Sequence, residues 1–153
     1  MGTEIERKFL VNKAKWQPDS NGVHYRQGYL CPGTGVTVRI RIAGEQACIT
    51  VKGPSRGYSR AEYEYSIPLP DAEEMLSSLC QQPLIEKTRY PVDYGGHQWE
   101  VDVFAAANQG LILAEIELPS EDTEFPLPPW VDREVSDDPR FFNSALARTP
   151  QPR

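Results

Sequence analysis

Charged and apolar residues alternate one by one in short segments along most of this chain. In TEIERKFLV (3–11) every second residue from Glu4 to Lys8 is charged, and in VRIRI (38–42) the two arginines alternate with β-branched residues. Because successive side chains of a β-strand point to opposite faces, each segment is typical of a strand with a charged face and an apolar face. We identify eight candidate strands, at residues 3–11, 23–31, 36–43, 46–53, 58–68, 85–93, 98–105 and 111–118.

Short connections and two helical segments complete the predicted architecture. Turn signals separate neighbouring strands, which are therefore expected to be antiparallel; they lie at residues 32–35, 43–45, 53–55 and 95–96. One helix is predicted after Asp71, with Glu74 completing a capping box, and another after Asp138. The proline-rich residues 119–130 predict an extended connection. The chain length favours a single domain, over residues 1–148, and the last residues, 149–153, are expected to form a flexible tail.

The charged strand faces together carry acidic and basic side chains in similar numbers. They are Glu4, Glu6, Glu62, Glu64, Glu100, Asp102, Glu115 and Glu117, with Lys8, Arg39, Arg41, Lys52, Arg60, Lys87 and Arg89. An open antiparallel sheet with one solvated face produces such an alternation. However, whole strands here are acidic or basic, whereas a solubilising face mixes the signs more freely. The alternative is a closed eight-stranded antiparallel barrel with a charged lumen, whose outward apolar faces are covered by the two helices. Either way, the fold is mainly β (α+β).

A charged lumen would limit the ligands that such a barrel binds. Buried charges are tolerated only when they are paired, hydrated or bound to a ligand. Arginine and lysine suit phosphate oxygens, and clustered carboxylates suit Mg²⁺ or Mn²⁺. The barrel is therefore predicted to hold a small polyphosphate together with a metal ion.

Charge, hydropathy and cysteine content argue against several other functions. The net charge of −6 disfavours a nucleic-acid surface. No segment approaches the roughly 18 consecutive apolar residues of a membrane span, and no signal peptide is visible. Cys31, Cys48 and Cys80 have no C-x-x-C spacing and are expected to be free thiols. These features predict a cytoplasmic protein without nucleic-acid or membrane partners.

Eight motifs, taken in sequence order, resemble those of one known family. Glu4-x-Glu6-x-Lys8 is similar to the E-x-E-x-K signature of the CYTH superfamily, the triphosphate tunnel metalloenzymes. The similarity continues through Gln27-Gly28-Tyr29-Leu30, Arg39-x-Arg41, Thr50-x-Lys52-Gly53, Arg60-x-Glu62-x-Glu64, Lys87-x-Arg89, Glu100-x-Asp102 and Glu115-x-Glu117. The C-terminal EVSDDPRFFNSALA (134–147) resembles the end of the short bacterial members, so the resemblance covers nearly the whole chain.

The resemblance implies a tunnel that binds a linear triphosphate with Mg²⁺ or Mn²⁺. It implies metal ligation by Glu4, Glu6, Glu115 and Glu117, with Asp102, Glu62 and Glu64 as secondary candidates. It implies phosphate binding by Lys8, Arg39, Arg41, Lys52, Arg60, Lys87 and Arg89. For catalysis, Lys87 would be the general base if cationic neighbours lower its pKa, and Tyr29 would help to place the attacking water. The alternative for Lys87 is one more phosphate contact.

Inorganic triphosphate (tripolyphosphate) is the first substrate hypothesis, because the strand faces carry charge and no dedicated organic pocket is visible. Thiamine triphosphatase or class IV-type adenylate cyclase activity would need aromatic contacts at a tunnel mouth. Candidates for those contacts are Tyr25, Tyr58, Trp16 and Trp130. A non-enzymatic polyphosphate-binding module would not need four clustered glutamates. An outer flank rich in Ile, Val and Tyr would suit a homodimer.

Overall fold

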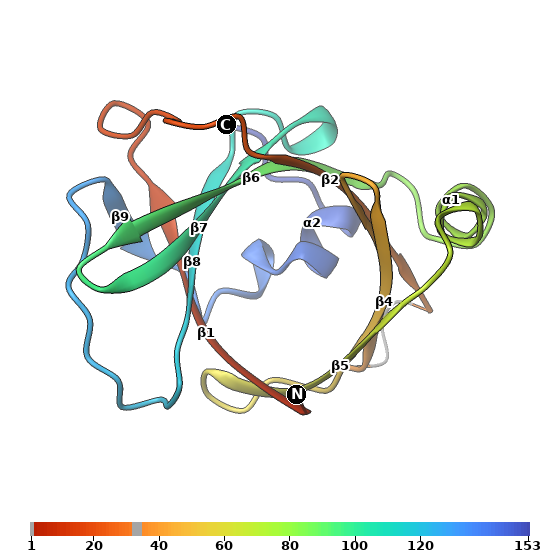
Figure 1. Ribbon diagram of the computed structural model, residues 1–153, viewed down its shortest axis with the longest axis horizontal. Coiled ribbons are helices and arrows are strands. Elements are labelled where there is room, and N and C mark those ends of the chain that lie inside the picture. Colours follow the sequence, from red (N-terminus) through yellow and green to blue (C-terminus); the bar gives the residue numbers. More distant parts are fainter. Residues whose placement is uncertain (1, 32–34) are drawn as a thin grey trace.

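Residues 2–31 and 35–153 are described by a computed structural model, which shows a closed antiparallel β-barrel (Figure 1). The barrel strands are β1 (Gly2–Val11), β2 (Val23–Leu30), β3 (Thr37–Ala43), β4 (Gln46–Lys52), β5 (Ser59–Ser66), β6 (Ile85–Tyr94), β7 (His97–Phe104) and β8 (Ile112–Glu117). Their order around the barrel is β1-β5-β4-β3-β2-β6-β7-β8, and β8 pairs with β1 again. The predicted closed barrel is confirmed, with every predicted strand present to within a few residues. The predicted turn at residues 32–35 lies mostly outside the described residues.

Strand β1 closes the barrel because it pairs with a different strand on each edge. Its residues 2–5 pair with β5, so that Glu4 lies opposite Arg60. Its residues 6–10 pair with β8, which places Glu6 opposite Glu117. Two carboxylates from opposite ends of the sequence are thereby brought to the same side of the lumen.

A ninth strand, β9 (Val131–Glu134), is not among the predicted strands. It pairs with the far end of β1, opposite Phe9 and Val11, where β5 no longer covers that edge. With four residues, three of them charged, it has too short a pattern to be recognised in the sequence. Residues 119–130, which connect β8 to β9, contain neither helix nor strand, so the predicted extended connection is confirmed.

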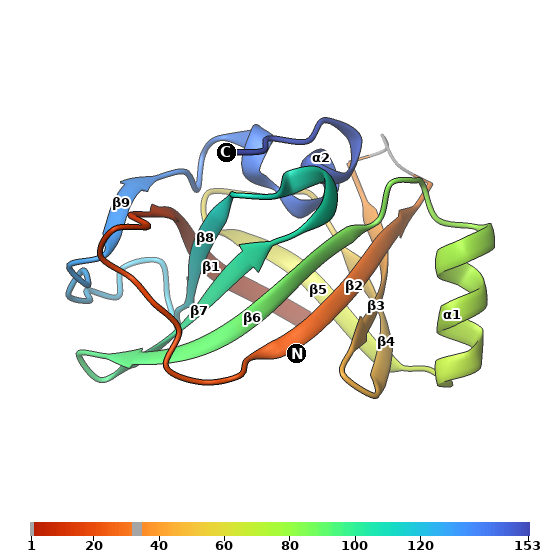
Figure 2. The same cartoon turned by 90° about the horizontal axis from the view of Figure 1, so that it is seen from above.

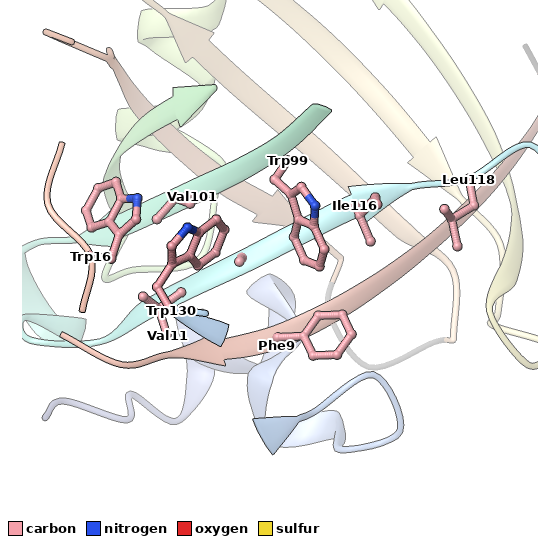
Figure 3. Close-up of a cluster of buried hydrophobic side chains, with 9 residues drawn as sticks. Phe9, Val11, Trp16, Trp99, Val101, Ile116, Leu118 and Trp130 are labelled. Carbon is pink, nitrogen blue, oxygen red and sulfur yellow. The ribbon is translucent and has the colours of Figure 1, made fainter. Parts of the chain in front are cut away.

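The outer faces of β1, β7 and β8 are buried under an aromatic cluster (Figure 3). Trp99 is fully buried at its centre, with ring centroids 5.4 Å from Phe9 and 5.7 Å from Trp130. The cover comes from loops: Trp16 follows β1, and Phe125 and Trp130 belong to the connection before β9. Loops, rather than a helix, therefore exclude water from this side of the barrel.

Replacement of Trp99 with alanine should lower the free energy of unfolding by about 3–5 kcal/mol, because it empties the centre of this cluster. Tyr65→Ala is the matched control, since Tyr65 lies on the outer face of β5 and is 61% exposed; it should change stability by only about 0.5 kcal/mol. Denaturant unfolding followed by circular dichroism measures both. Equal costs for the two variants would show that the aromatic cluster is not packed as described.

Helix α1 (Leu69–Ser78) covers the outside of β3 and β4, as expected. Its Ala72 and Leu76 pack against Ile40 and Ile42. The helix begins earlier than predicted, however, and its N-cap, Pro68, makes no side-chain cap hydrogen bond. Pro70 lies in the first turn, where backbone N–H groups have no partner within the helix, so its missing N–H costs no hydrogen bond. The helix can therefore start before Asp71. The predicted capping box is therefore wrong.

The second predicted helix is divided into two short pieces, the 3-10 turn η2 (Pro139–Phe141) and α2 (Asn143–Arg148). Asp138 caps η2 by accepting a hydrogen bond from the backbone nitrogen of Arg140. Phe142 has an extended backbone and separates the pieces. No described helix has the length and hydropathy needed to cross a membrane.

Helix α2 lies across one end of the barrel instead of on its outer face, as Figures 1 and 2 show together. Its Leu146 is fully buried with Phe104, Leu113 and Ile85, whose side chains continue the lumen-facing rows of their strands. Those rows change from charged to apolar toward this end, and an apolar lumen end needs an apolar cover. The expectation that both helices cover the outside is thus wrong for α2, which makes the lumen a cup.

The last residues, 149–153, follow α2 past the 3-10 turn η1 (Ala106–Asn108). The backbone nitrogen of Gln151 donates to Asn108 Oδ1, and that of Arg153 donates to the carbonyl of Gln109. The flexibility of this tail stays a prediction.

Candidate active site

The lumen holds a cavity of about 210 Å³, and α2 lies across one end of the barrel (Figure 2). Its volume is below the roughly 300–1,000 Å³ of sites for drug-sized ligands, which favours a small guest. Nearly all predicted site residues line it, namely Glu4, Glu6, Lys8, Tyr29, Arg39, Arg41, Lys52, Arg60, Glu62, Glu64, Lys87, Arg89, Glu115 and Glu117. Asp102 does not; it lies fully buried behind Lys87 and Arg89.

The charges divide the lumen into an acidic half and a basic half because of the strand order. Strands β7, β8, β1 and β5 are consecutive around the barrel and carry all the lumen carboxylates. Strands β4, β3, β2 and β6 form the other half and carry only basic or uncharged lumen residues. Lys8 and Arg60 are the exceptions, being cations on acidic strands. A guest in the lumen therefore has carboxylates on one side and cations on the other.

Two lysines neutralise part of the acidic half. Lys52 Nζ lies 2.9 and 3.1 Å from the two carboxylate oxygens of Glu4 and 3.3 Å from Glu62. Lys8 Nζ lies 3.3 Å from Glu115, which also accepts a hydrogen bond from Arg89. Although burial alone would raise it, these cations hold the pKa of Glu115 well below its usual value.

Glu6 and Glu117 form no ion pair within 4 Å with either lysine in the described structure. Burial, together with the charges of Glu115 and Glu4, raises the pKa of Glu6 to about 8. Burial and the charges of Glu4, Glu62 and Glu100 also raise the pKa of Glu117. Such crowding is relieved by a bound divalent cation, which takes carboxylate oxygens as ligands.

The donor chemistry of this half therefore fits a divalent metal, but the ligands are not drawn together around one point. No three Asp, Glu, His or Cys side chains within residues 2–31 and 35–153 converge as a ready metal site. The contacts of Lys52 and Lys8 give the reason, because those ammonium groups occupy the oxygens of Glu4 and Glu115. A ligand that draws the lysines away would free these oxygens.

The two arginines of β3 lack close carboxylate partners in the described part of the chain. Arg39 is 6% exposed; its Nη2 donates to Thr50 Oγ1, its nearest carboxylate oxygen is 3.9 Å away on Glu64, and its buried Nε has no hydrogen-bond partner. Arg41 donates through Nε to the side chain of Gln27. Burial and the charges of Arg39 and Arg89 lower the pKa of Arg41 to about 10. A phosphate or another small anion would suit both guanidinium groups.

Lys87 is fully buried beside Asp102, at the closed end of the cavity. Its Nζ donates to Asp102 Oδ2 at 2.7 Å, and Arg89 binds the same carboxylate at 2.7 and 2.8 Å. Burial and the charges of Arg89 and Arg41 lower the pKa of Lys87 to about 7, although Asp102 opposes the change. Both oxygens of Asp102 are used as a counter-ion, which argues against its predicted role as a metal ligand.

Tyr29 lines the cavity but makes no hydrogen bond to Lys87 in the described structure. Its hydroxyl accepts from Gln27 Nε2 at 3.2 Å, and the same nitrogen donates to Asn143 Oδ1, which also accepts from Lys87 Nζ. Neither amide was a candidate from the sequence. Gln27 could have been recognised from the sequence, since it shares a strand face with Tyr25 and Tyr29. Asn143 could not, because no sequence feature indicated that the C-terminal helix lies at the lumen.

The aromatic residues proposed for a tunnel mouth are mostly elsewhere. Trp16 and Trp130 are each 8% exposed, in the outer cluster of Figure 3. Tyr25 packs below the guanidinium groups of Arg41 and Arg89. Of the four candidates, Tyr58 alone lines the cavity.

The protein is a closed antiparallel barrel whose cup-shaped lumen is divided into an acidic and a basic half. These features place it in the class of tunnel-type β-barrel domains. A family model described as the CYTH domain matches residues 2–142. The chain therefore belongs to the CYTH domain family, and the resemblance found in the sequence is confirmed.

Two relatives are similar over almost their whole length. The chain is 48% identical to an inorganic triphosphatase of Acetivibrio thermocellus, covering 98% of this chain and 96% of that protein. It is 42% identical to an inorganic triphosphatase of Nitrosomonas europaea, covering 95% and 97%. Among solved structures, the crystal structure of the inorganic triphosphatase NE1496 is 38% identical, with a TM-score of 0.70 and coverage of 98% and 100%.

Proposed function

We propose that this protein hydrolyses inorganic triphosphate to diphosphate and phosphate inside the cup, with a divalent metal, Mg²⁺ or Mn²⁺. The observation that carries the proposal is the buried guanidinium of Arg39, whose Nε has no partner within the described structure. A buried cationic donor without an acceptor is costly, and phosphate oxygens would satisfy it. The two relatives named inorganic triphosphatase, at 48% and 42% identity, support this substrate.

The basic half would hold the triphosphate. Arg39 and Arg41 offer guanidinium forks from one strand, while Arg60 has no carboxylate partner among the described residues and bonds to the carbonyl of Gly53. Triphosphate would also compete for Lys52 and Lys8, because its oxygens carry more charge than a single carboxylate. Drawing these lysines away would expose Glu4 and Glu115 to a metal ion.

The acidic half would hold the metal, through Glu4, Glu6, Glu115 and Glu117, with Glu62 and Glu64 as further candidates. Bound there, the ion would supply Lewis-acid stabilisation of phosphate oxygens. The protein's own contribution is largely positioning and charge, as phosphoryl transfer requires.

Lys87 would act as the general base at the closed end of the cup. A water oxygen attacks the terminal phosphorus, the bond from that phosphorus to the bridging oxygen breaks, and diphosphate leaves. The water proton passes to the neutral amine of Lys87, whose lowered pKa makes that form accessible near neutral pH. Arg39 and Arg41 stabilise the charge that develops on the phosphates.

A second candidate substrate, an organic triphosphate, is favoured by one feature. A cavity of about 280 Å³ adjoins the lumen at the α2 end, shares Tyr29, Arg60 and Phe142 with it, and adds Leu30 and Pro54 as apolar lining. An organic group could occupy this space while its phosphates bind in the cup. The sequence shows no sign of this cavity, because strand ends, loops and α2 form it together.

Phosphate release separates these candidates. Purified protein is incubated with tripolyphosphate, thiamine triphosphate and ATP, each with Mg²⁺, with Mn²⁺ and with EDTA. We expect metal-dependent release that is fastest with tripolyphosphate. Faster release from thiamine triphosphate or ATP would favour the organic substrate, whereas binding without release from any of them would leave a non-enzymatic polyphosphate-binding module.

A homodimer and a cytoplasmic location stay predictions. Tyr63 and Tyr65 are exposed on the outer face of β5, where a second copy could bind. Cys31, Cys48 and Cys80 are free thiols in the described structure.

A further inference from the structure

Asn143 is carried into the active-site cup by the helix that closes it. It is the first residue of α2, and its side chain lines the lumen cavity. Its Oδ1 accepts hydrogen bonds from Lys87 Nζ at 3.1 Å and from Gln27 Nε2 at 3.2 Å. Asn143 therefore joins the C-terminal segment to the lysine that we propose as the general base.

The direction of every hydrogen bond around Asn143 follows from a fixed donor. An arginine nitrogen can only donate, so the bond from Arg41 Nε identifies the acceptor end of the Gln27 amide as Oε1. The other end of Gln27 is then a donor, and it bonds to Tyr29 Oη and Asn143. Because Lys87 also donates, Asn143 must present its oxygen to both neighbours, and its Nδ2 end is directed elsewhere.

These bonds fix the orientation of Lys87 Nζ. A lysine ammonium has three N–H donors, of which one bonds to Asp102 at 2.7 Å and one to Asn143. The third position has no hydrogen-bond partner within the described structure, and Lys87 is among the residues that line the lumen cavity. In the neutral amine the lone pair takes that third position. With Asp102 alone as partner, Nζ could rotate about a single hydrogen bond.

We propose that Asn143 is a positioning residue for triphosphate hydrolysis, which holds the Lys87 amine with its free position toward the lumen. This inference rests on the proposed function. It also assigns the C-terminal helix a part in the reaction beyond closing the barrel, because the amine is fully oriented only when α2 is in place.

The test compares Asn143→Leu, which has a similar volume and no acceptor, with Asn143→Asp, which keeps an oxygen toward both donors. Steady-state kinetics with tripolyphosphate and Mg²⁺ are measured at a pH where the rate no longer changes with pH. Asn143→Leu should lower kcat by about 10–100-fold with KM within about twofold, the effect of a misplaced reacting group. Asn143→Asp should recover kcat to within several-fold of wild type, with a raised KM because its charge repels the substrate.

Arg140→Ala is the control for disruption of the C-terminal segment. Arg140 lies in η2, is exposed, and donates to Asp138, the N-cap of that turn. It does not line the lumen cavity, so its removal should leave kcat unchanged. Melting temperatures of all three variants show whether α2 stays folded.

Each outcome decides the inference. Unchanged kcat in Asn143→Leu, equal loss of kcat in the Leu and Asp variants, or a raised KM with unchanged kcat in Asn143→Leu would overturn it, and the last result would make Asn143 a substrate contact. These results require an active wild type, so they leave the proposed function intact. An inactive wild type would overturn both.

Discussion

Replacement of Glu117 with alanine is expected to lower metal-dependent hydrolysis of tripolyphosphate by about 10³-fold. A metal ligand contributes several kcal/mol of transition-state stabilisation, and each 1.36 kcal/mol is a factor of ten in rate. Glu117 is suited to this role because no lysine or arginine forms an ion pair with it in the described structure, and it faces Glu6 across the β1–β8 pairing. We expect Glu4→Ala to be inactive as well, because Glu4 is another of the proposed metal ligands.

The same substitution should not destabilise the metal-free protein. Burial and neighbouring acids raise the pKa of Glu117 in the folded state. A carboxylate with a raised folded-state pKa costs stability above its unfolded pKa, so at neutral pH the alanine variant should melt at the wild-type temperature or higher. Loss of activity with retained stability is typical of residues kept for function.

Glu74→Ala on α1 is the matched control for Glu117→Ala, since Glu74 is an exposed acid outside the barrel. It should keep wild-type activity. Phosphate release across a Mg²⁺ titration, with melting curves in EDTA, covers both variants. Full activity of Glu117→Ala would contradict the metal assignment.

Replacement of Lys87 with methionine should lower kcat by about 10²–10⁴-fold, the usual contribution of a general base. The fold should survive, because Met fills the same volume and Asp102 keeps both hydrogen bonds from Arg89. Lys87→Arg separates the two roles considered for this residue. Arginine keeps the positive charge but cannot lose a proton, so it should be as inactive as methionine if Lys87 is the base. An active Lys87→Arg would make Lys87 a phosphate contact.

The pH dependence of kcat carries the same information. Since the pKa of Lys87 is lowered to about 7, the neutral amine forms as the pH rises through that value. Wild-type kcat should therefore increase from pH 6 to pH 8 and then level off. The rising limb should vanish in Lys87→Met, and its persistence there would assign the limb to another group.

The barrel and most of its lining were predictable because strand parity is a local property. A residue such as Arg39 points to the same face as Arg41 whatever the rest of the chain does, so the lumen set could be derived from alternation. The segregation into two halves follows from the strand order around the barrel, which alternation did not predict.

Contacts between distant segments were not predictable in the same way. Leu10 and Leu113 continue the charged rows of β1 and β8, so the lumen is apolar at that end. An apolar lumen end indicates that something covers it. The periodicity of a helix, however, does not tell which part of the barrel the helix covers, so α2 could not be assigned to this end. The hydrogen bonds of Asn143 depend on that docking. The alternation pattern did not distinguish Asp102 from the other lumen acids. The register of β6 and β7 in the structure is what places it beside Lys87 and Arg89.

The most direct test of the two-sided cup is a crystal structure of Lys87→Met with tripolyphosphate and Mn²⁺, with anomalous scattering recorded to locate the manganese. We predict a triphosphate bound to Arg39 and Arg41, with an oxygen near Arg39 Nε. We predict manganese between that triphosphate and the carboxylates of Glu6 and Glu117, and Lys52 turned from Glu4 toward phosphate. Triphosphate bound outside the lumen, or manganese bound away from the acidic half, would contradict the account.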